Sequence, residues 1–139
     1  MKRDAGIQDY VIERMNRLLT TLAFQVHRAA KKPGAEEIHD LRVSIRRFLQ
    51  GLLLFTEMFP NWEVKKIKRM LKRMMQLTSE IRNRDIALEY LATETGRAHC
   101  ERLRKERSVF QRRFAEMVRR WNARDFSAKW RNALSLRGV

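Results

Sequence analysis

The chain has 139 residues, of which 44% are apolar, and this is enough for one domain with its own hydrophobic core. Its 2 prolines and 5 glycines are typical of long helices, and its single cysteine excludes an internal disulfide framework or a thiol metal cluster. Lys and Arg number 31 against 16 Asp and Glu, and the net charge of +15 predicts a polyanionic partner such as nucleic acid, an anionic membrane surface or polyphosphate.

The sequence carries no sign of insertion into a membrane or of export. No run approaches about 18 apolar residues, so no membrane-spanning helix is predicted. The first residues, MKRDAGIQDYVIER, contain no apolar signal core and no small-residue cleavage site. We therefore expect a cytoplasmic protein.

The first predicted helix runs from about Ala5 to Lys31, with Asp4 as its N-cap. Its apolar residues recur at three-four spacing: Ile7, Val11, Met15, Leu18, Leu22, Val26 and Ala29. The dipeptide Pro33-Gly34 ends this helix, and a second helix is predicted from about Glu36 to Met58. The core stripe of the second helix is Ile38, Leu41, Ile45, Phe48/Leu49, Leu52, Phe55 and Phe59.

The remaining chain predicts three further helices. Pro60-Asn61 interrupts the chain, and the third helix begins near Trp62 and continues to about Leu91. After a weak break in TETGR, around Gly96, a fourth helix spans about Ala98 to Asn122, and Asp125 opens a short fifth helix that ends near Leu134. Long helices with short connections predict an all-α fold, namely an antiparallel four-helix bundle with a short C-terminal fifth helix, in a single domain over residues 1–139.

Polar side chains in the second helix form a strip beside its apolar face. His39, Arg42, Arg46 and Gln50 lie at i, i+3, i+7 and i+11, so they share one side of the helix. Arg47 projects from a different side. A strip of donors at the edge of the core can line a groove between two helices.

In the third helix, the core stripe reaches a charged pair, Arg84-Asp85, where an apolar residue is expected. Ionised side chains seldom enter a core unless they are paired or hydrogen-bonded. Either Asp85 forms a salt bridge with an arginine of a neighbouring helix and fixes the register of the bundle, or it orients Arg42 or Arg46 for a ligand. In both interpretations Asp85 is structural support, because a carboxylate that faced a polyanion would repel it.

The fourth helix also has a charged residue where the apolar spacing predicts an inward-facing side chain. The spacing of Leu103, Arg107 and Phe110 places Arg107 on the inward seam, and His99 lies on the same side one turn before Leu103. A hydrogen-bonded histidine near a helix start explains His99 without a ligand, and His27 lies off the apolar stripe, at the surface. The aromatic residues lie on apolar stripes, where core packing explains them.

Recognisable catalytic, nucleotide and metal motifs are missing from the sequence. There is no glycine-rich phosphate loop, no pair of histidines at metal-binding spacing, and no cofactor motif. His39-Asp40 alone does not define a phosphohydrolase, because the other acidic and histidine ligands are not evident. We expect no catalytic residues, no metal and no cofactor.

The segments IHDLRVSIRRFLQGLLLF and LTSEIRNRDIALEYL, with RLRKERSVFQRRFAEMVRRW and FSAKWRNAL after them, resemble the CHAD domain over nearly the whole chain. The resemblance implies a helical domain that binds inorganic polyphosphate along a basic surface, associates with polyphosphate granules and has no catalytic residues. On this resemblance, the expected polyphosphate-binding residues are His39, Arg42, Arg46, Arg47, Lys65, Lys68, Arg69, Lys72, Arg73, Arg82, Arg84 and Arg107. Lys65, Arg69 and Lys72 lie opposite the core stripe, so a simple solvated surface also explains them.

The chain departs from the family in length. A usual CHAD domain is about twice as long and contains two related bundles, whereas this chain has one H-x-x-R-V-x-x-R-R segment and resembles the first half. A homodimer that rebuilds the double bundle is therefore our hypothesis. A basic nucleic-acid-binding protein is the alternative function, although the sequence shows no helix-turn-helix, zinc finger or RNA-recognition signature. A basic scaffold that binds a protein partner is a third possibility.

Overall fold

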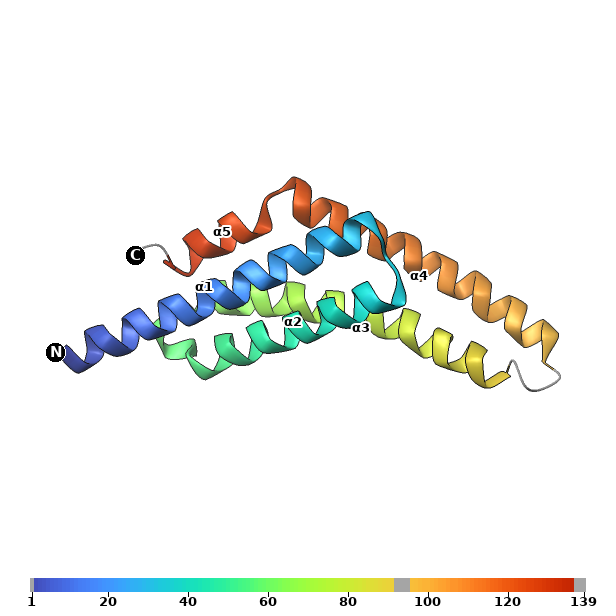
Figure 1. The fold of residues 1–139 in the computed structure, drawn as a ribbon, viewed down its shortest axis with the longest axis horizontal. Helices are drawn as coiled ribbons and strands as arrows, with labels where there is room; N and C mark the ends of the chain where they lie inside the picture. Colours follow the sequence, from blue (N-terminus) through green and yellow to red (C-terminus); the bar gives the residue numbers. More distant parts are fainter. Residues whose placement is uncertain (1, 92–95, 137–139) are drawn as a thin grey trace.

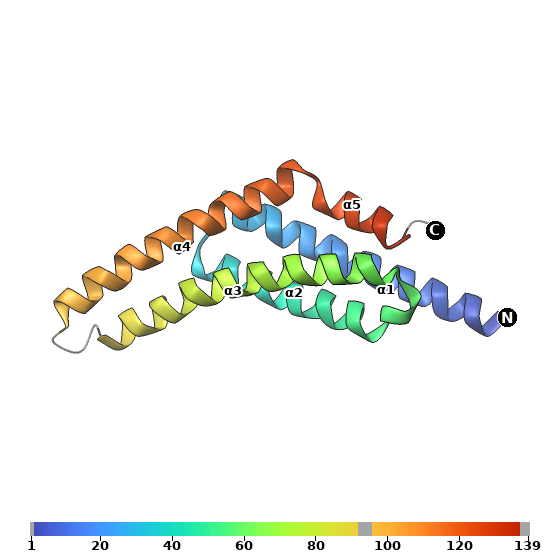
Figure 2. The same ribbon diagram turned by 180° about the vertical axis from the view of Figure 1, so that it is seen from behind.

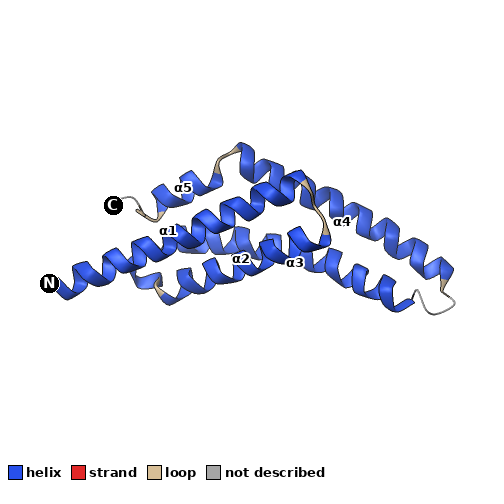
Figure 3. Cartoon of the chain, viewed as in Figure 1, coloured by secondary structure: helices blue, strands red, loops and turns tan. Residues whose placement is uncertain are grey.

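The structure is a computed structural model, and it describes residues 2–91 and 96–136. Helices make up nearly all of these residues, and no strand occurs among them (Figure 3). In chain order the elements are α1 (Lys2–Lys31), α2 (Ala35–Leu54), the 3-10 turn η1 (Thr56–Met58), α3 (Asn61–Leu91), α4 (Arg97–Ala123) and α5 (Phe126–Ala133) (Figure 1). The predicted all-α bundle with a short C-terminal helix is confirmed.

The first four helices close a ring, in which each packs on the next along the chain and α1 also packs on α4. The hairpin of α1 and α2 is antiparallel, since Arg28 near the end of α1 bonds Asp40 near the start of α2 at 2.7 Å. At the other end of this hairpin, Gly51 of α2 lies against Met15 of α1. The second half of α3 and the first half of α4 run on together past α1 and α2 as a two-helix arm (Figures 1 and 2).

The core lies where the four helices and α5 converge. Its largest fully buried side chains include Phe48, Phe114, Met15, Leu41 and Met74. Near the C-terminus, four aromatic rings pack with centroids 5.0 to 5.9 Å apart: Phe48, Trp121, Phe126 and Trp130. These edge and stacked contacts hold α5 on the bundle, where it covers α1 and α4.

Two predicted boundaries are wrong. Helix α1 begins at Lys2, so Asp4 lies within the helix and is not its N-cap. Helix α2 ends at Leu54 instead of continuing to Met58, and the chain then tightens into η1. The predicted break in TETGR falls between α3 and α4, and residues 93–95 lie outside the described residues.

One core stripe also differs from its prediction. Ile7 is 56% exposed, and Leu19 is fully buried while Leu18 is only partly buried. The N-terminal part of α1 projects beyond the neighbouring helices (Figure 1), so nothing covers Ile7 there. The stripe of α2 is buried largely as predicted, from Ile38 to Leu52, and α3 buries Ile67, Leu71, Met74, Leu77 and Ile81 at three-four spacing.

Candidate functional site: a basic strip where α2 meets α3

Helix α2 presents its polar strip to α3. Arg42 reaches across to α3, and its guanidinium donates hydrogen bonds to Met75 O at 2.8 Å, Thr78 Oγ1 at 2.7 Å and Ser79 Oγ at 3.0 Å. His39 and Arg46 lie one turn to either side of Arg42 and are exposed. The predicted groove-lining strip therefore follows the junction of α2 and α3.

Arg42 is a buried cation whose hydrogen-bond partners are all neutral. Its side chain is only 7% exposed, and its Nε atom has no hydrogen-bond partner. Among the described residues, no carboxylate lies within salt-bridge distance of it. Burial lowers the pKa of Arg42, and the nearby charges of Arg46 and Arg82 lower it further. The protein thus holds three cations close together without neutralising the innermost one.

A small hollow of about 140 Å³ opens beside this guanidinium. Its basic lining comes from His39, Arg42 and Arg82, and its apolar lining comes mainly from Ile38, Ile81 and Ile86. Asp85 and Glu89 border it toward the arm. An anion that entered this hollow would meet donors from both helices.

Further cations of α3 continue along the same junction. Met75 and Ser79 of α3 face Arg42. Lys68 and Arg82 each lie seven residues from Met75, and Lys72 lies three residues before it, so helical spacing puts all three on the side of α3 that faces Arg42. We define the α2/α3 strip by the residues that the two helices place together: His39, Arg42, Arg46, Lys68, Lys72 and Arg82. Lys65 is exposed and lies seven residues before Lys72, so it shares that side of α3 beyond the end of the strip, whereas the exposed Arg69 lies further round on the outer side of the helix.

Two predicted ligand residues lie on other surfaces. Arg47 borders a hollow of about 280 Å³ between α2 and α1, together with Arg14 and Arg17. Arg73 lies on the opposite side of α3, where it lines the groove toward α4. The structure therefore does not bring Arg47 or Arg73 into the α2/α3 strip.

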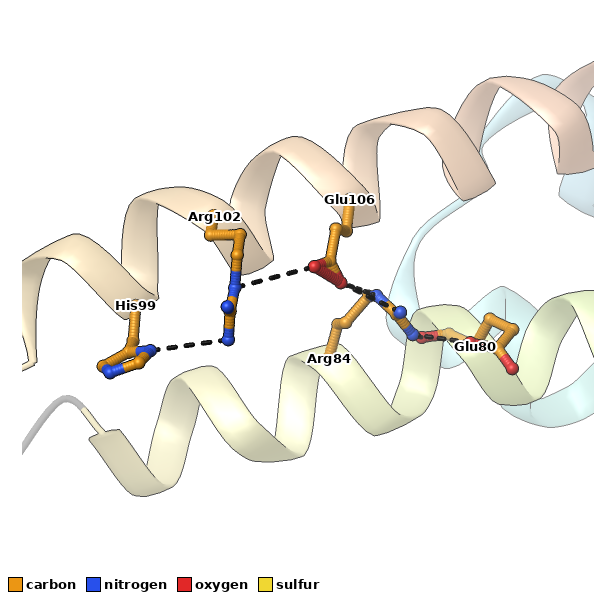
Figure 4. A network of polar contacts seen from close by, with 5 residues as sticks. All are labelled: Glu80, Arg84, His99, Arg102 and Glu106. Atoms are coloured by element: carbon orange, nitrogen blue, oxygen red, sulfur yellow. Dashed lines mark hydrogen bonds and ion pairs between the residues drawn. The ribbon is translucent and has the colours of Figure 1, made fainter.

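Two other predicted ligand residues are already paired within the arm. Arg84 bonds Glu80 Oε2 at 2.6 Å and Glu106 Oε2 at 3.0 Å (Figure 4), and it lies 4.5 Å from the ring centre of Phe110. Arg107 of α4 forms an ion pair with Asp85 of α3. Asp85 thus has a partner on a neighbouring helix, and that partner is Arg107 rather than Arg42 or Arg46.

The arm also corrects the position of His99. This side chain is exposed, and Nδ1 lies 3.4 Å from Arg102, which in turn approaches Glu106 (Figure 4). Cys100, one residue later, is buried in the position that the seam requires. His27 is exposed, as its place off the apolar stripe predicted.

The neutral oxygens that hold Arg42 could not be identified from the sequence. Thr78 is fully buried, and its hydroxyl also donates to Met74 O at 2.9 Å, which is what a threonine bonded to its own helix backbone does without any arginine. Arg28 was likewise not predicted; it bonds Asp40 at 2.7 Å and Glu37 at 3.5 Å and ties α1 to α2. The hydrogen bond that Arg28 donates to the Asp40 carboxylate raises the pKa of Arg28.

A cluster of metal ligands and a membrane-spanning helix are both absent from the described residues. Across residues 2–91 and 96–136, no three His, Cys, Asp or Glu side chains gather in a way that could hold a metal ion. In the same part of the chain, no helix combines the length and the apolar character that crossing a membrane requires. The α2/α3 strip presents several basic side chains, of which Arg42 is held in place by three hydrogen bonds.

Comparison with known proteins matches this chain to a family. The family model of the CHAD domain matches residues 15–138. The search of curated proteins and the search of solved structures each returned no match.

Proposed function

The chain belongs to the CHAD domain family, and from this premise we propose that it binds inorganic polyphosphate through the α2/α3 strip and catalyses no reaction on it. The family is associated with polyphosphate binding in general. The contribution of this chain is a row of Arg, Lys and His donors along one junction of two helices. A linear polyanion requires such a row, and it requires no recognition of bases.

The observation that carries this proposal is the charge on Arg42. A cation that is 7% exposed, bonded only to neutral oxygens and close to Arg46 and Arg82, is unfavourable in the unliganded protein. A phosphate beside it would supply the missing counter-charge and would relieve the repulsion among the three arginines. Phosphate binding would therefore stabilise the buried charge of Arg42, which is unfavourable in the free protein.

The donors suit phosphate oxygens in different ways. Arg46 and Arg82 are exposed and can offer forked, charge-assisted hydrogen bonds, which are among the strongest that proteins form. Lys68 and Lys72 add point charges along the same line. His39 can donate a hydrogen bond to a phosphate oxygen.

The proposal is tested by fluorescence anisotropy with labelled long-chain polyphosphate. Replacement of Arg42 and Arg46 by Ala is expected to weaken binding by at least tenfold, and affinity is expected to fall with salt as counterions are released, by analogy with nucleic acids. A matched control replaces Arg112 and Arg119, exposed residues of α4, by Ala. Unchanged affinity in a folded Arg42→Ala/Arg46→Ala protein would remove the strip from the function.

We further propose that two copies of the chain pair and together present two strips. The support is that the sequence contains one histidine-and-arginine helix where the family it resembles has two. The chain mass is 16.7 kDa, so light scattering should give about twice this value at micromolar concentration. A single species at 16.7 kDa would refute pairing and leave polyphosphate binding by one strip intact.

In cells that store polyphosphate, we propose that such a module gathers at the granules. A fluorescent fusion should form foci that coincide with stained polyphosphate, and the Arg42→Ala/Arg46→Ala fusion should remain diffuse. Foci that persist in this variant would mean that another surface directs the protein there.

A further inference from the structure

A second groove runs along the opposite side of α3, where α4 and α5 pack beside it. Two hollows of about 480 and 570 Å³ adjoin there, because Arg73, Met117 and Arg120 line both. The first lies between α3 and α4, and the second continues between α3 and α5. We call this continuous feature the α3/α4 groove.

The groove has the length of a helix of several turns. On α3 its wall extends from Glu63 to Glu80 with three-four spacing, which at 1.5 Å per residue is about 25 Å. On α4 the wall extends from Phe110 to Arg124 with the same spacing. Each of these two walls is one face of a single helix, and α5 lines the second hollow as well.

The groove has an apolar floor. Met70 and Met117 are partly buried along its middle and Phe110 is partly buried at one end, while Ile67 and Leu77 are buried in the same lining. Methionine side chains are flexible and polarisable, and they are frequent on surfaces that accept apolar side chains of varied shape. A chain of phosphates has no apolar part with which to cover this floor.

The rim of the groove is basic. It carries six cations against three acids, and its cations are Lys66, Arg73, Arg113, Arg120, Arg124 and Lys129. One of the acids, Glu80, already pairs with Arg84. Among the described residues, no salt bridge within 4.0 Å engages any of these six cations.

These features together select the ligand. We propose that the α3/α4 groove binds an acidic amphipathic helix of a protein partner, whose apolar face covers the methionine floor and whose carboxylates meet the rim. An amphipathic helix laid in an apolar groove is a recurrent mode of recognition, read at three-four spacing. A base or nucleotide fits less well, because Trp121 and Trp130 are only 6% and 5% exposed and offer no free ring face for stacking.

The groove and the α2/α3 strip lie on different sides of α3, so the two ligands can bind together. The inference does not depend on polyphosphate binding. A module that holds polyphosphate on one side and a protein on the other would link the two. The test must therefore separate the two surfaces.

The probe is a fluorescein-labelled 17-residue peptide that carries Leu at three-four spacing and Glu elsewhere, measured by anisotropy with and without long-chain polyphosphate. The groove variant is Arg113→Glu/Arg120→Glu, and the control variant is Arg112→Glu/Arg119→Glu. Both pairs are exposed, lie seven residues apart on α4 and change the net charge equally, but Arg112 and Arg119 line neither hollow. Arg113→Gln/Arg120→Gln serves as a milder variant if charge reversal perturbs folding.

We expect the groove variant to bind the peptide at least tenfold more weakly and the control variant to lose less than twofold. A scrambled peptide of the same composition should bind at least tenfold more weakly than the amphipathic one. Equal binding of both peptides, or equal loss in both variants, would overturn the proposal in favour of general charge attraction. Failure of the peptide to bind would also overturn the proposal. So would the finding that polyphosphate fully displaces the peptide and that only the groove variant loses polyphosphate binding, because polyphosphate would then be the ligand of the groove.

Discussion

Replacement of Arg42 by Met separates a structural role of this residue from a binding role. Met has a similar reach and no charge, so it can fill the space that the Arg42 side chain occupies at 7% exposure. Thr78 Oγ1 still donates to Met74 O at 2.9 Å and to Met75 O at 3.1 Å, and Ser79 is only partly buried, so water can reach its hydroxyl. The substitution therefore removes a buried charge and leaves no buried donor unpaired.

The expected stability follows from these contacts. Removing one partner of a buried ion pair strands a charge and costs about 3–5 kcal/mol, but Arg42 has no charged partner to strand. Each lost hydrogen bond to a neutral oxygen is offset by the desolvation that the cation no longer suffers. We expect the free energy of unfolding to stay within about 1 kcal/mol of the parent protein, most simply slightly above it.

The expected affinity moves in the opposite direction. A hydrogen bond between a cation and a phosphate contributes about 1.5–3 kcal/mol, so Arg42→Met should weaken polyphosphate binding by about tenfold or more. Urea unfolding followed by circular dichroism gives the stability, and anisotropy gives the affinity. A loss of about 3 kcal/mol or more with unchanged affinity would refute the reasoning and make Arg42 a structural link between α2 and α3.

Three further outcomes test the remaining cations and their partners. Replacing Lys72 and Arg82 together by Ala should weaken polyphosphate binding about tenfold and lower its salt dependence, and an unchanged salt slope would place the ligand elsewhere. Arg84→Met should lower stability by about 1 kcal/mol, because it removes partly exposed ion pairs and a ring contact, and should change polyphosphate affinity less than twofold. Asp85→Asn should lower stability by about 0.5–1 kcal/mol in chemical unfolding without weakening polyphosphate binding, and a tenfold loss of affinity would make Asp85 an organiser of the site.

The helices were predictable because their apolar spacing and their breakers are local. The stripe from Ile38 to Leu52 and the breaks at Pro33-Gly34 and Pro60-Asn61 are each visible within one or two turns of chain. The predicted burial of Ile7 was wrong because burial depends on where the neighbouring helices end, and the spacing within one helix does not contain that information. The predicted end of α2 was also wrong, because no proline or glycine marks the change from α-helix to the 3-10 turn.

The candidate site was predictable in part. Helical spacing grouped His39, Arg42 and Arg46, and in the structure His39 lines the hollow beside Arg42, whose pKa is lowered by burial and further by the nearby charge of Arg46. Spacing also separated Arg47, which borders a different hollow. Spacing could not pair helices in space, so it left open whether Asp85 meets Arg42 or an arginine of another helix. The α3/α4 groove was missed because its apolar floor and its basic rim come from residues up to about 65 positions apart along the chain, from Glu63 to Lys129.

The central claim is that the α2/α3 strip recognises polyphosphate rather than nucleic acid. The most direct measurement titrates the parent protein and its Arg42→Ala/Arg46→Ala variant with long-chain polyphosphate and with duplex DNA, at equal phosphate concentration and equal salt. We expect polyphosphate to bind at least tenfold more tightly than DNA, and we expect the variant to lose most of this preference. DNA binding as tight as polyphosphate binding, or a preference for polyphosphate that the variant retains, would contradict it.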